Sequence, residues 1–157
     1  MTKRSVGILL YRGRGAELRL LLVHPGGPFW AKKDQGAWSI PKGEYEEGEE
    51  PLAGARREFE EELGAPAPDG DVIELGEFVQ PSRKVITAFG VEGDFDPSSL
   101  TSNQFEMEWP PKSGRRQSFP EVDRAAWFRS DEAKVKMLPG QRPFIDRLLE
   151  HLEKLAS

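Results

Sequence analysis

The stretch "GEYEEGEEPLAGARREFEEELG", from Gly43 to Gly64, says the most about how this chain folds and works. Nine of its 22 residues are glutamate, and only Arg56 and Arg57 oppose them. The whole chain of 157 residues has a formal net charge of only −5, so the acidity is concentrated here. A focused negative charge indicates a cation site or another special site rather than general solubility.

The second half of this stretch predicts an α-helix from Pro51 to Leu63. Proline suits the first helical turn, and Gly64 suits the residue just after the helix ends. Apolar residues recur with a helical period and form one stripe that can pack on a sheet: Leu52, Ala55, Phe59 and Leu63. We therefore expect an amphipathic helix with acidic residues on its opposite face.

Glu58, Glu61 and Glu62 share that opposite face, at spacings of three and four residues. Like charges at these spacings repel by roughly 0.2–0.5 kcal/mol per exposed pair. Gly54, in the same arc, costs about 1 kcal/mol relative to alanine. A divalent cation such as Mg²⁺ would explain both choices, because it takes carboxylate oxygens and needs the room that Gly54 leaves. The alternative is an acidic helix face that is merely solvated.

The residues in and before this helix resemble the Nudix box. That motif is glycine, five residues, glutamate, seven residues, Arg-Glu, an aliphatic or aromatic residue, any residue, Glu-Glu, any residue, glycine and an aliphatic residue. Every spacing is met, with these residues at the fixed positions: Gly43, Glu49, Arg57, Glu58, Phe59, Glu61, Glu62, Gly64 and Ala65. Ala65 is the one departure, because a larger aliphatic residue is usual there.

The resemblance implies an α+β fold, a Nudix-type α/β/α sandwich around a mixed β-sheet. We expect one such domain over residues 1–157, since this length suits a single core. The resemblance also implies a pyrophosphohydrolase that cleaves a nucleoside diphosphate linked to another moiety, with one to three Mg²⁺ or Mn²⁺ ions bound by the box. Bound metal would neutralise the glutamates and bridge them to an anionic substrate.

The motif also implies roles for particular residues. By position, Glu58 and Glu62 are metal ligands, and Glu61 is a third ligand or the catalytic base. Gly43 is expected to let the loop turn tightly and to offer its carbonyl to the metal.

Further roles concern charged residues around these ligands. Arg57 is expected to orient Glu49 through a bidentate ion pair, with a plain surface pair as the alternative. Many Nudix enzymes add an acid from outside the box, and Glu121 is our candidate because "FPEVDRAAWF" is similar to the segment that often supplies it. Glu106 and Glu108 are the alternates.

Residues outside the box bear on the substrate. The Pro-Lys-Gly sequence that ends at Gly43 resembles diadenosine-polyphosphate hydrolases, and Lys42 is a candidate contact to a non-scissile phosphate. Arg115 and Arg116 are candidates for further phosphates, and Trp109 is a candidate for stacking on a base. Solvated loop charge and core packing are the competing explanations for these residues.

Three functions stay open from the sequence. The first is hydrolysis of a dinucleoside polyphosphate or a related nucleotide. The second is cleansing of modified nucleoside triphosphates, or pyrophosphate removal from mRNA 5′ ends. The third is a non-catalytic nucleotide sensor on the Nudix fold, which the intact box disfavours because such sensors usually have an eroded box.

The rest of the chain predicts strands on both sides of the central helix, and a last helix. The expected strands cover Ser5–Tyr11, Leu18–His24, residues 71–80 and 84–93 as a hairpin, Phe105–Trp109 and Arg124–Phe128. The expected helix covers residues 142–155, with an apolar stripe of Phe144, Leu148, Leu152 and Leu155.

Composition excludes several other classes of protein. The chain has no cysteine, so a disulfide framework and thiolate chemistry are excluded. No segment approaches the roughly 20 apolar residues of a membrane span, and no signal-peptide pattern is present, so we expect a cytoplasmic protein without a membrane partner. No broad basic face indicates duplex nucleic acid. Histidine chemistry is not expected, since neither His24 nor His151 has a partner pattern.

Overall fold

A mixed β-sheet forms the centre of the computed structural model, which describes residues 4–44 and 46–156. Its strands are β1 (Arg4–Arg12), β2 (Arg19–Pro25), β3 (Lys42–Glu44), β4 (Val72–Val79), β5 (Val85–Glu92) and β8 (Val122–Phe128). Five of them lie in the order β4-β5-β1-β2-β8, and β3 pairs with β1. The β1–β5 pair is parallel, and the other pairs in this sheet are antiparallel.

The central strand β1 explains how the acidic stretch reaches the middle of the molecule. Every residue from Ser5 to Tyr11 is buried, as a nearly continuous apolar run predicts for a strand covered on both faces. Near its end β1 pairs with β2, whereas near its start it pairs with β3, with Val6 opposite Gly43. The first residues of the acidic stretch therefore lie beside the centre of the sheet.

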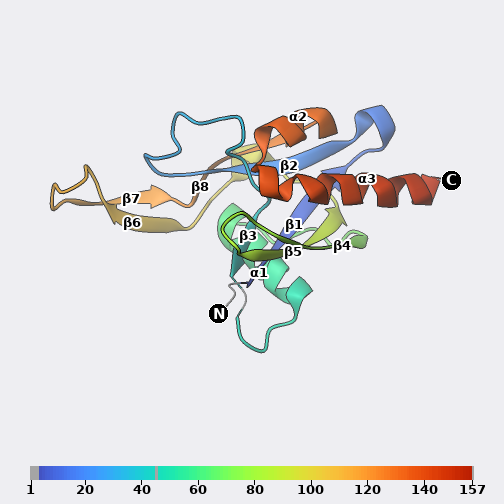
Figure 1. Cartoon of the computed structure of the whole chain (residues 1–157), viewed down its shortest axis with the longest axis horizontal. Coiled ribbons are helices and arrows are strands. Elements are labelled where there is room, and N and C mark those ends of the chain that lie inside the picture. Colours follow the sequence, from blue (N-terminus) through green and yellow to red (C-terminus); the bar gives the residue numbers. More distant parts are fainter. Residues whose placement is uncertain (1–3, 45, 157) are drawn as a thin grey trace.

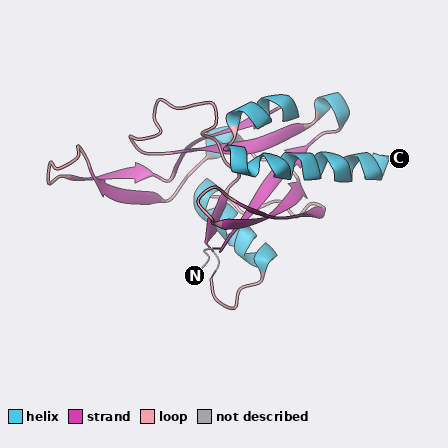
Figure 2. Cartoon of the chain, viewed as in Figure 1, coloured by secondary structure: helices cyan, strands magenta, loops and turns pink. Residues whose placement is uncertain are grey.

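Helices cover both faces of this sheet (Figures 1 and 2). Helix α1 (Pro51–Leu63) packs on one face, and α2 (Ser130–Lys136) and α3 (Arg142–Ala156) lie on the other. Each face has its own apolar cluster, with Phe59 in the first and Phe144 in the second, and both are fully buried. The α+β class and the α/β/α sandwich expected from the sequence are confirmed.

Helix α1 has the limits that the sequence predicts. Pro51 is its first residue, and Gly64 follows its end with a left-handed φ of 81°, which glycine adopts without strain. Ala55, Phe59 and Leu63 are fully buried against the sheet. The opposite face of α1 is left to the glutamates.

A two-stranded hairpin, β6 (Gln104–Glu108) and β7 (Arg116–Pro120), extends away from the body of the protein (Figure 1). We predicted β6 but not β7, whose polar residues lack a clear alternation. Strand β3 and helix α2 were also missed, because both are short and carry weak apolar patterns. The expected stripe on α3 is wrong at Leu155, which is 71% exposed because the helix continues beyond the sheet it covers.

No helix in the described part of the chain has the length and apolar character needed to cross a membrane.

Candidate active site

Glu62 and Lys42 meet where α1 faces β3. The backbone N–H of Lys42 donates a hydrogen bond of 3.2 Å to Oε1 of Glu62. Burial raises the pKa of Glu62 to about 8, although the neighbouring Lys42 charge opposes this change. Burial also lowers the pKa of the Lys42 ammonium group. The site therefore holds a carboxylate that needs a positive charge close to it.

Gly43, the next residue of β3, lies directly against Glu58. A Cβ atom at Gly43 would lie 1.9 Å from Oε2 of Glu58, so only glycine allows this approach. The expectation that Gly43 forms a tight turn is wrong, because Gly43 lies in a strand and pairs with Val6. Its physical role is to bring its own main chain and the Glu58 carboxylate together.

Arg57 forms the centre of an ion-pair network. Its Nε donates to Glu49 Oε2 at 2.8 Å and its Nη2 to Glu49 Oε1 at 3.0 Å, which is the bidentate geometry expected from the sequence. Its Nη1 donates to Glu58 at 2.8 Å and to Glu61 at 3.3 Å. Hydrogen bonds from Arg57 lower the pKa of Glu49, and those carboxylates raise the pKa of Arg57. Arg57 thus holds three glutamates of the box in one group.

Gly54 does not leave open room beside the acids, contrary to our expectation. A Cβ atom there would lie 2.8 Å from Glu49 Oε1 and 3.2 Å from a methyl group of Val6. The space is filled by the carboxylate that Arg57 holds. The glycine is therefore needed for packing between α1 and the loop before it.

Glu121 lies between β7 and β8, and the fold brings it toward the acids of α1. Its N–H donates to the Asn103 carbonyl at 2.8 Å, and its own carbonyl accepts from the Gly26 N–H at 2.9 Å. Desolvation and the charge of Glu61 raise the pKa of Glu121, and the charge of Glu121 in turn raises the pKa of both Glu58 and Glu62. Four carboxylates from two parts of the sequence thus affect one another.

The alternates Glu106 and Glu108 lie on the hairpin instead. Glu106 is 3.7 Å from Arg116, and Glu108 accepts a 2.7 Å hydrogen bond from the Lys112 N–H. Neither contributes to the pKa changes of the box glutamates. The geometry therefore favours Glu121 as the additional acid.

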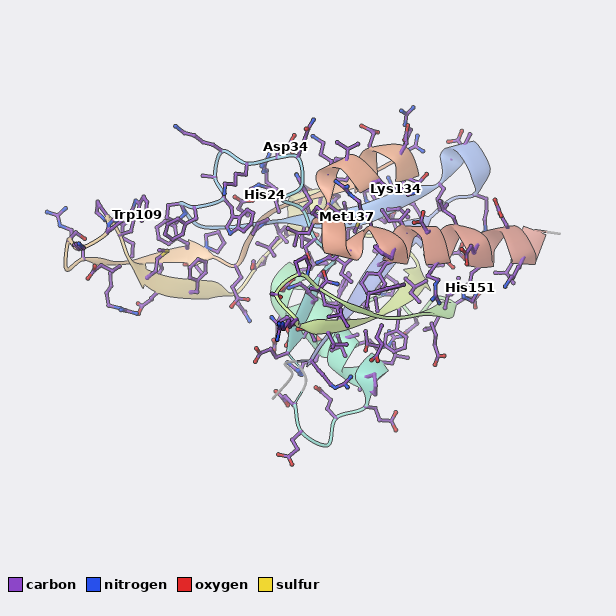
Figure 3. The ribbon with its side chains drawn as sticks, in the orientation of Figure 1. His24, Asp34, Trp109, Lys134, Met137 and His151 are labelled. Carbon is purple, nitrogen blue, oxygen red and sulfur yellow. The ribbon has the colours of Figure 1, made fainter. Side chains whose placement is uncertain are left out.

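Trp109, Arg115 and Arg116 also belong to the hairpin, which extends away from the body (Figures 1 and 3). The Trp109 ring packs edge-on against Phe29, with 5.5 Å between ring centroids, and Phe29 is 62% exposed. The backbone N–H of Trp109 donates to the Arg115 carbonyl at 2.9 Å. These three residues form an aromatic and basic surface, separate from the acids of α1, and their substrate role stays a prediction.

The donor chemistry of the site suits a divalent cation. In the described side-chain arrangement, no three acidic or histidine side chains are gathered closely enough to hold one ion, because Glu58 and Glu61 bond to Arg57. However, the Gly43 main chain and the Glu58 carboxylate share a space that any Cβ would fill. Carboxylate and carbonyl oxygens are the ligands that Mg²⁺ and Mn²⁺ accept. Glu58, Glu61 and the Gly43 carbonyl would fit such an ion if the two carboxylates turned from Arg57 toward it.

Sequence reasoning missed the partners of His24. His24 is fully buried, and its Nδ1 lies 2.8 Å from Asp123 Oδ1 while its Nε2 lies 2.6 Å from the Lys33 carbonyl oxygen. The sequence shows no partner pattern for His24, yet the fold gives it two partners. The pairing of β2 with β8 brings Asp123 to the ring, and the loop after β2 brings Lys33, so no local pattern could have shown them.

The family model of the NUDIX domain matches residues 1–148. The chain belongs to the Nudix family. The enzyme class expected from the sequence, a Nudix pyrophosphohydrolase, is confirmed at this level, and Nudix hydrolases generally need a divalent metal.

Solved Nudix structures share the fold at low sequence identity. A C. elegans Ap4A hydrolase binary complex superposes with a TM-score of 0.63 at 15% identity, over 96% of this chain and 98% of that one. The Nudix domain of Shewanella oneidensis NrtR, complexed with ADP ribose, gives 0.63 at 16% identity over 97% and 89%. The M. smegmatis Nudix hydrolase RenU gives 0.60 at 22% identity over 96% and 86%.

One curated relative differs in name and in length. An octanoyltransferase of Myxococcus xanthus is 36% identical over 112 residues, which is 68% of this chain. The chain spans only 30% of that protein's length, so the likeness concerns one part of it.

Proposed function

We propose that the protein, as a single Nudix domain over residues 1–157, hydrolyses the pyrophosphate link of a nucleoside diphosphate derivative with the help of Mg²⁺ or Mn²⁺. The favoured substrate is a dinucleoside polyphosphate or a related nucleotide. The observation that carries this proposal is that Glu58 and Glu62 lie against β3, at Gly43 and Lys42, while Arg57 holds Glu61 beside Glu58. Packing and local helix stability explain none of these charges.

In this proposal each acid has a distinct task. Glu58 and Glu62, with the Gly43 carbonyl, hold the metal. A bound divalent ion polarises the phosphoryl oxygens and lowers the pKa of water. Glu61 is the base, since it has the more exposed carboxylate, with 43% of its side chain exposed against 13% for Glu58. It accepts a proton as the water oxygen bonds to phosphorus and the bridging P–O bond breaks.

Arg57 and Glu121 complete the catalytic group. Arg57 orients Glu49 and holds Glu58 and Glu61 close together, where a metal ion would take its place between the two carboxylates. Glu121 adds a negative charge on the side of Glu61, where it attracts the metal or orients the attacking water. The hydrogen bonds of Arg57 support its role, and the position of Glu121 relative to the motif supports the role of Glu121.

Positive charge and aromatic surface outside the acids support the preference for a long anionic substrate. Lys42 places a positive charge beside the metal-binding acids. Arg115 and Arg116 supply charge on the hairpin, where Trp109 and the exposed Phe29 offer aromatic surface for a base. Proteins of this fold include an Ap4A hydrolase and a Nudix domain complexed with ADP ribose. ADP ribose is therefore the second candidate substrate.

A substrate panel tests the proposal. Purified protein is incubated with diadenosine tetraphosphate, ADP ribose, a nucleoside diphosphate sugar and 8-oxo-dGTP, with Mg²⁺ or Mn²⁺, and products are separated by chromatography. We expect cleavage of the diadenosine compound with the highest kcat/KM and no cleavage after chelation by EDTA. Full activity in EDTA would refute the proposed metal dependence. Preferred cleavage of 8-oxo-dGTP would refute the proposed preference for dinucleoside polyphosphates.

A further inference from the structure

A fully buried histidine, His24, lies between the loop that follows β2 and the start of β8, the strand directly after Glu121. His24 ends the apolar run of β2, and its ring packs edge-on against Trp38 at 5.2 Å between centroids. Its Nε2 contacts the carbonyl oxygen of Lys33, in the loop that follows β2, and its Nδ1 contacts Asp123 on β8. Figure 3 shows His24 beside this loop. The ring therefore ties the loop to β8.

The protons of the ring follow from these partners. A carbonyl oxygen only accepts hydrogen bonds, so Nε2 carries a proton and donates it to Lys33. Nδ1 then either donates to an ionised Asp123 or accepts from a protonated one. In both cases the two bonds are made by one rigid ring, and alanine could make neither.

The pairing of β2 with β8 changes register at this point. His24 is opposite Arg124, but Pro25 is opposite Val122, so Asp123 is an additional residue in β8 without a partner across the pair. This is a β-bulge, a feature that redirects the chain and is common beside active sites. The Asp123 side chain, at the bulge, is the one that His24 holds.

The bulge determines where Glu121 lies. After it, the pairing continues with Val122 opposite Pro25 and with the Gly26 N–H bonded to the Glu121 carbonyl. Without the additional residue every position before Asp123 would move by one along β2. Because successive side chains in a strand point to opposite faces, such a slip would redirect the Glu121 carboxylate.

We propose that His24 is a positioning residue, which holds the bulge at Asp123 and the loop at Lys33 and thereby directs Glu121 toward the acids of α1. This proposal rests on the proposed function, in which Glu121 acts on the metal or the attacking water. It assigns a role to a residue outside the motif and to a contact between strands that are far apart in the sequence.

The first test compares the two histidines of the chain. His24→Ala should lower kcat by roughly 10–100-fold, the usual effect of losing a partner that orients a catalytic group, with KM changed much less. His151→Ala is the matched control, since His151 lies on α3 toward the far end of the protein (Figure 3) and kcat should stay as in wild type. Equal kcat values for the His24→Ala variant and wild type would overturn the proposal.

A second pair of variants tests the same bridge from the surface, in case His24→Ala folds poorly. Asp123, with 31% of its side chain exposed, can be replaced with less damage to the core. Asp123→Ala should resemble His24→Ala. Asp123→Asn should restore most of kcat, because its amide can donate to a neutral ring while Nε2 still donates to Lys33. An asparagine variant no better than the alanine variant would overturn the proposed bridge.

Two further measurements separate positioning from general structural damage. In a Glu121→Gln background, His24→Ala should lower kcat little further, because both changes remove the same contribution. An equal loss in both backgrounds would overturn the proposal. Without any substrate, His24→Ala should shift the backbone ¹H–¹⁵N signals of Glu121 and Gly26, and unshifted signals would also overturn it. If wild type cleaves no pyrophosphate substrate, the proposed function fails while this shift still tests the geometry.

Discussion

Helices α1 and α3 cover opposite faces of the same sheet, yet their sequences obey different rules. In α3, packing explains the pattern, since Phe144 and Leu148 are buried and the outer face is polar. In α1, packing explains Phe59, and it also explains Gly54, whose missing side chain makes room for Glu49, but it does not explain the neighbouring like charges. The comparison teaches that the carboxylates unexplained by packing include the two that lie against β3, Glu58 and Glu62.

The largest expected effect is on kcat, and it is tested by making the same substitution, glutamate to glutamine, on both helices. Glu58→Gln and Glu62→Gln should each lower kcat by more than the roughly 10–100-fold typical of outer-shell partners, because each removes a ligand of the metal ion that we propose. Glu150→Gln on α3, where the side chain is exposed, should leave kcat unchanged. Steady-state kinetics with Mg²⁺, together with circular dichroism to verify folding, provide the measurement.

The outcome also separates chemistry from structure. If the two α1 variants lose their fold along with their activity, the glutamates are structural. If Glu150→Gln lowers kcat as much as Glu62→Gln does, the glutamates of α1 have no special role in comparison with those of α3.

The apolar faces of the two helices should behave alike. Phe59 and Phe144 are both fully buried. Phe59→Ala and Phe144→Ala should therefore each lower the free energy of unfolding by about 3–5 kcal/mol. Urea denaturation measures this change. Activity per folded molecule should fall less than in the glutamine variants. A loss below about 1 kcal/mol for either variant would show that its side chain lies in a poorly packed site.

Much of this fold could be predicted because its strongest patterns are local. The limits of α1 follow from Pro51 and Gly64, and the buried run of β1 from its unbroken apolar residues. Strand β3 could not be predicted, since Lys42 to Glu44 become a strand only by pairing with β1. Helix α2 has seven residues and a single buried one, Ala133, so it has almost no period to detect.

The candidate site shows the same division. The motif positions of α1 and the Arg57–Glu49 pair could be expected from the resemblance to the Nudix box. The reason for Gly43 could not, because it depends on a carboxylate 15 residues later folding back against the strand, as the Cβ contact with Glu58 reveals. Asp123, one of the two partners of His24, lies on another strand, so it could be predicted only from the sheet register.

A smaller effect concerns the stability of the metal-free protein. Burial raises the folded-state pKa of Glu62 from 4.5 to about 8, so the folded state favours the protonated carboxyl. The resulting stability is fully present below pH 4.5 and is lost as the pH rises to about 8. Glu62→Gln should therefore match wild type near pH 4.5 in EDTA and become more stable than wild type toward pH 8. Thermal unfolding across this range measures the difference.

The control for this pH dependence is again Glu150→Gln, whose stability should follow wild type at every pH. If Glu62→Gln is less stable than wild type at pH 8, the prediction that burial destabilises the ionised Glu62 carboxylate is wrong. The Lys42 charge would then fully compensate the charge of Glu62.

The smallest expected effect is on KM, and it tests whether Lys42 binds the substrate or acts on the metal site. If Lys42 contacts a phosphate beyond the scissile link, Lys42→Ala should raise KM for a dinucleoside tetraphosphate by up to about tenfold, or about 1.4 kcal/mol. It should change KM for a nucleoside diphosphate sugar much less, and kcat should stay nearly constant, since a compact charge on a flexible stem adds uniform binding energy. Lys134→Ala on α2, on the other face of the sheet from α1, is the matched control. A lower kcat with unchanged KM would instead show that Lys42 acts through its neighbour Glu62, and equal KM effects on both substrates would remove the preference for long polyphosphates.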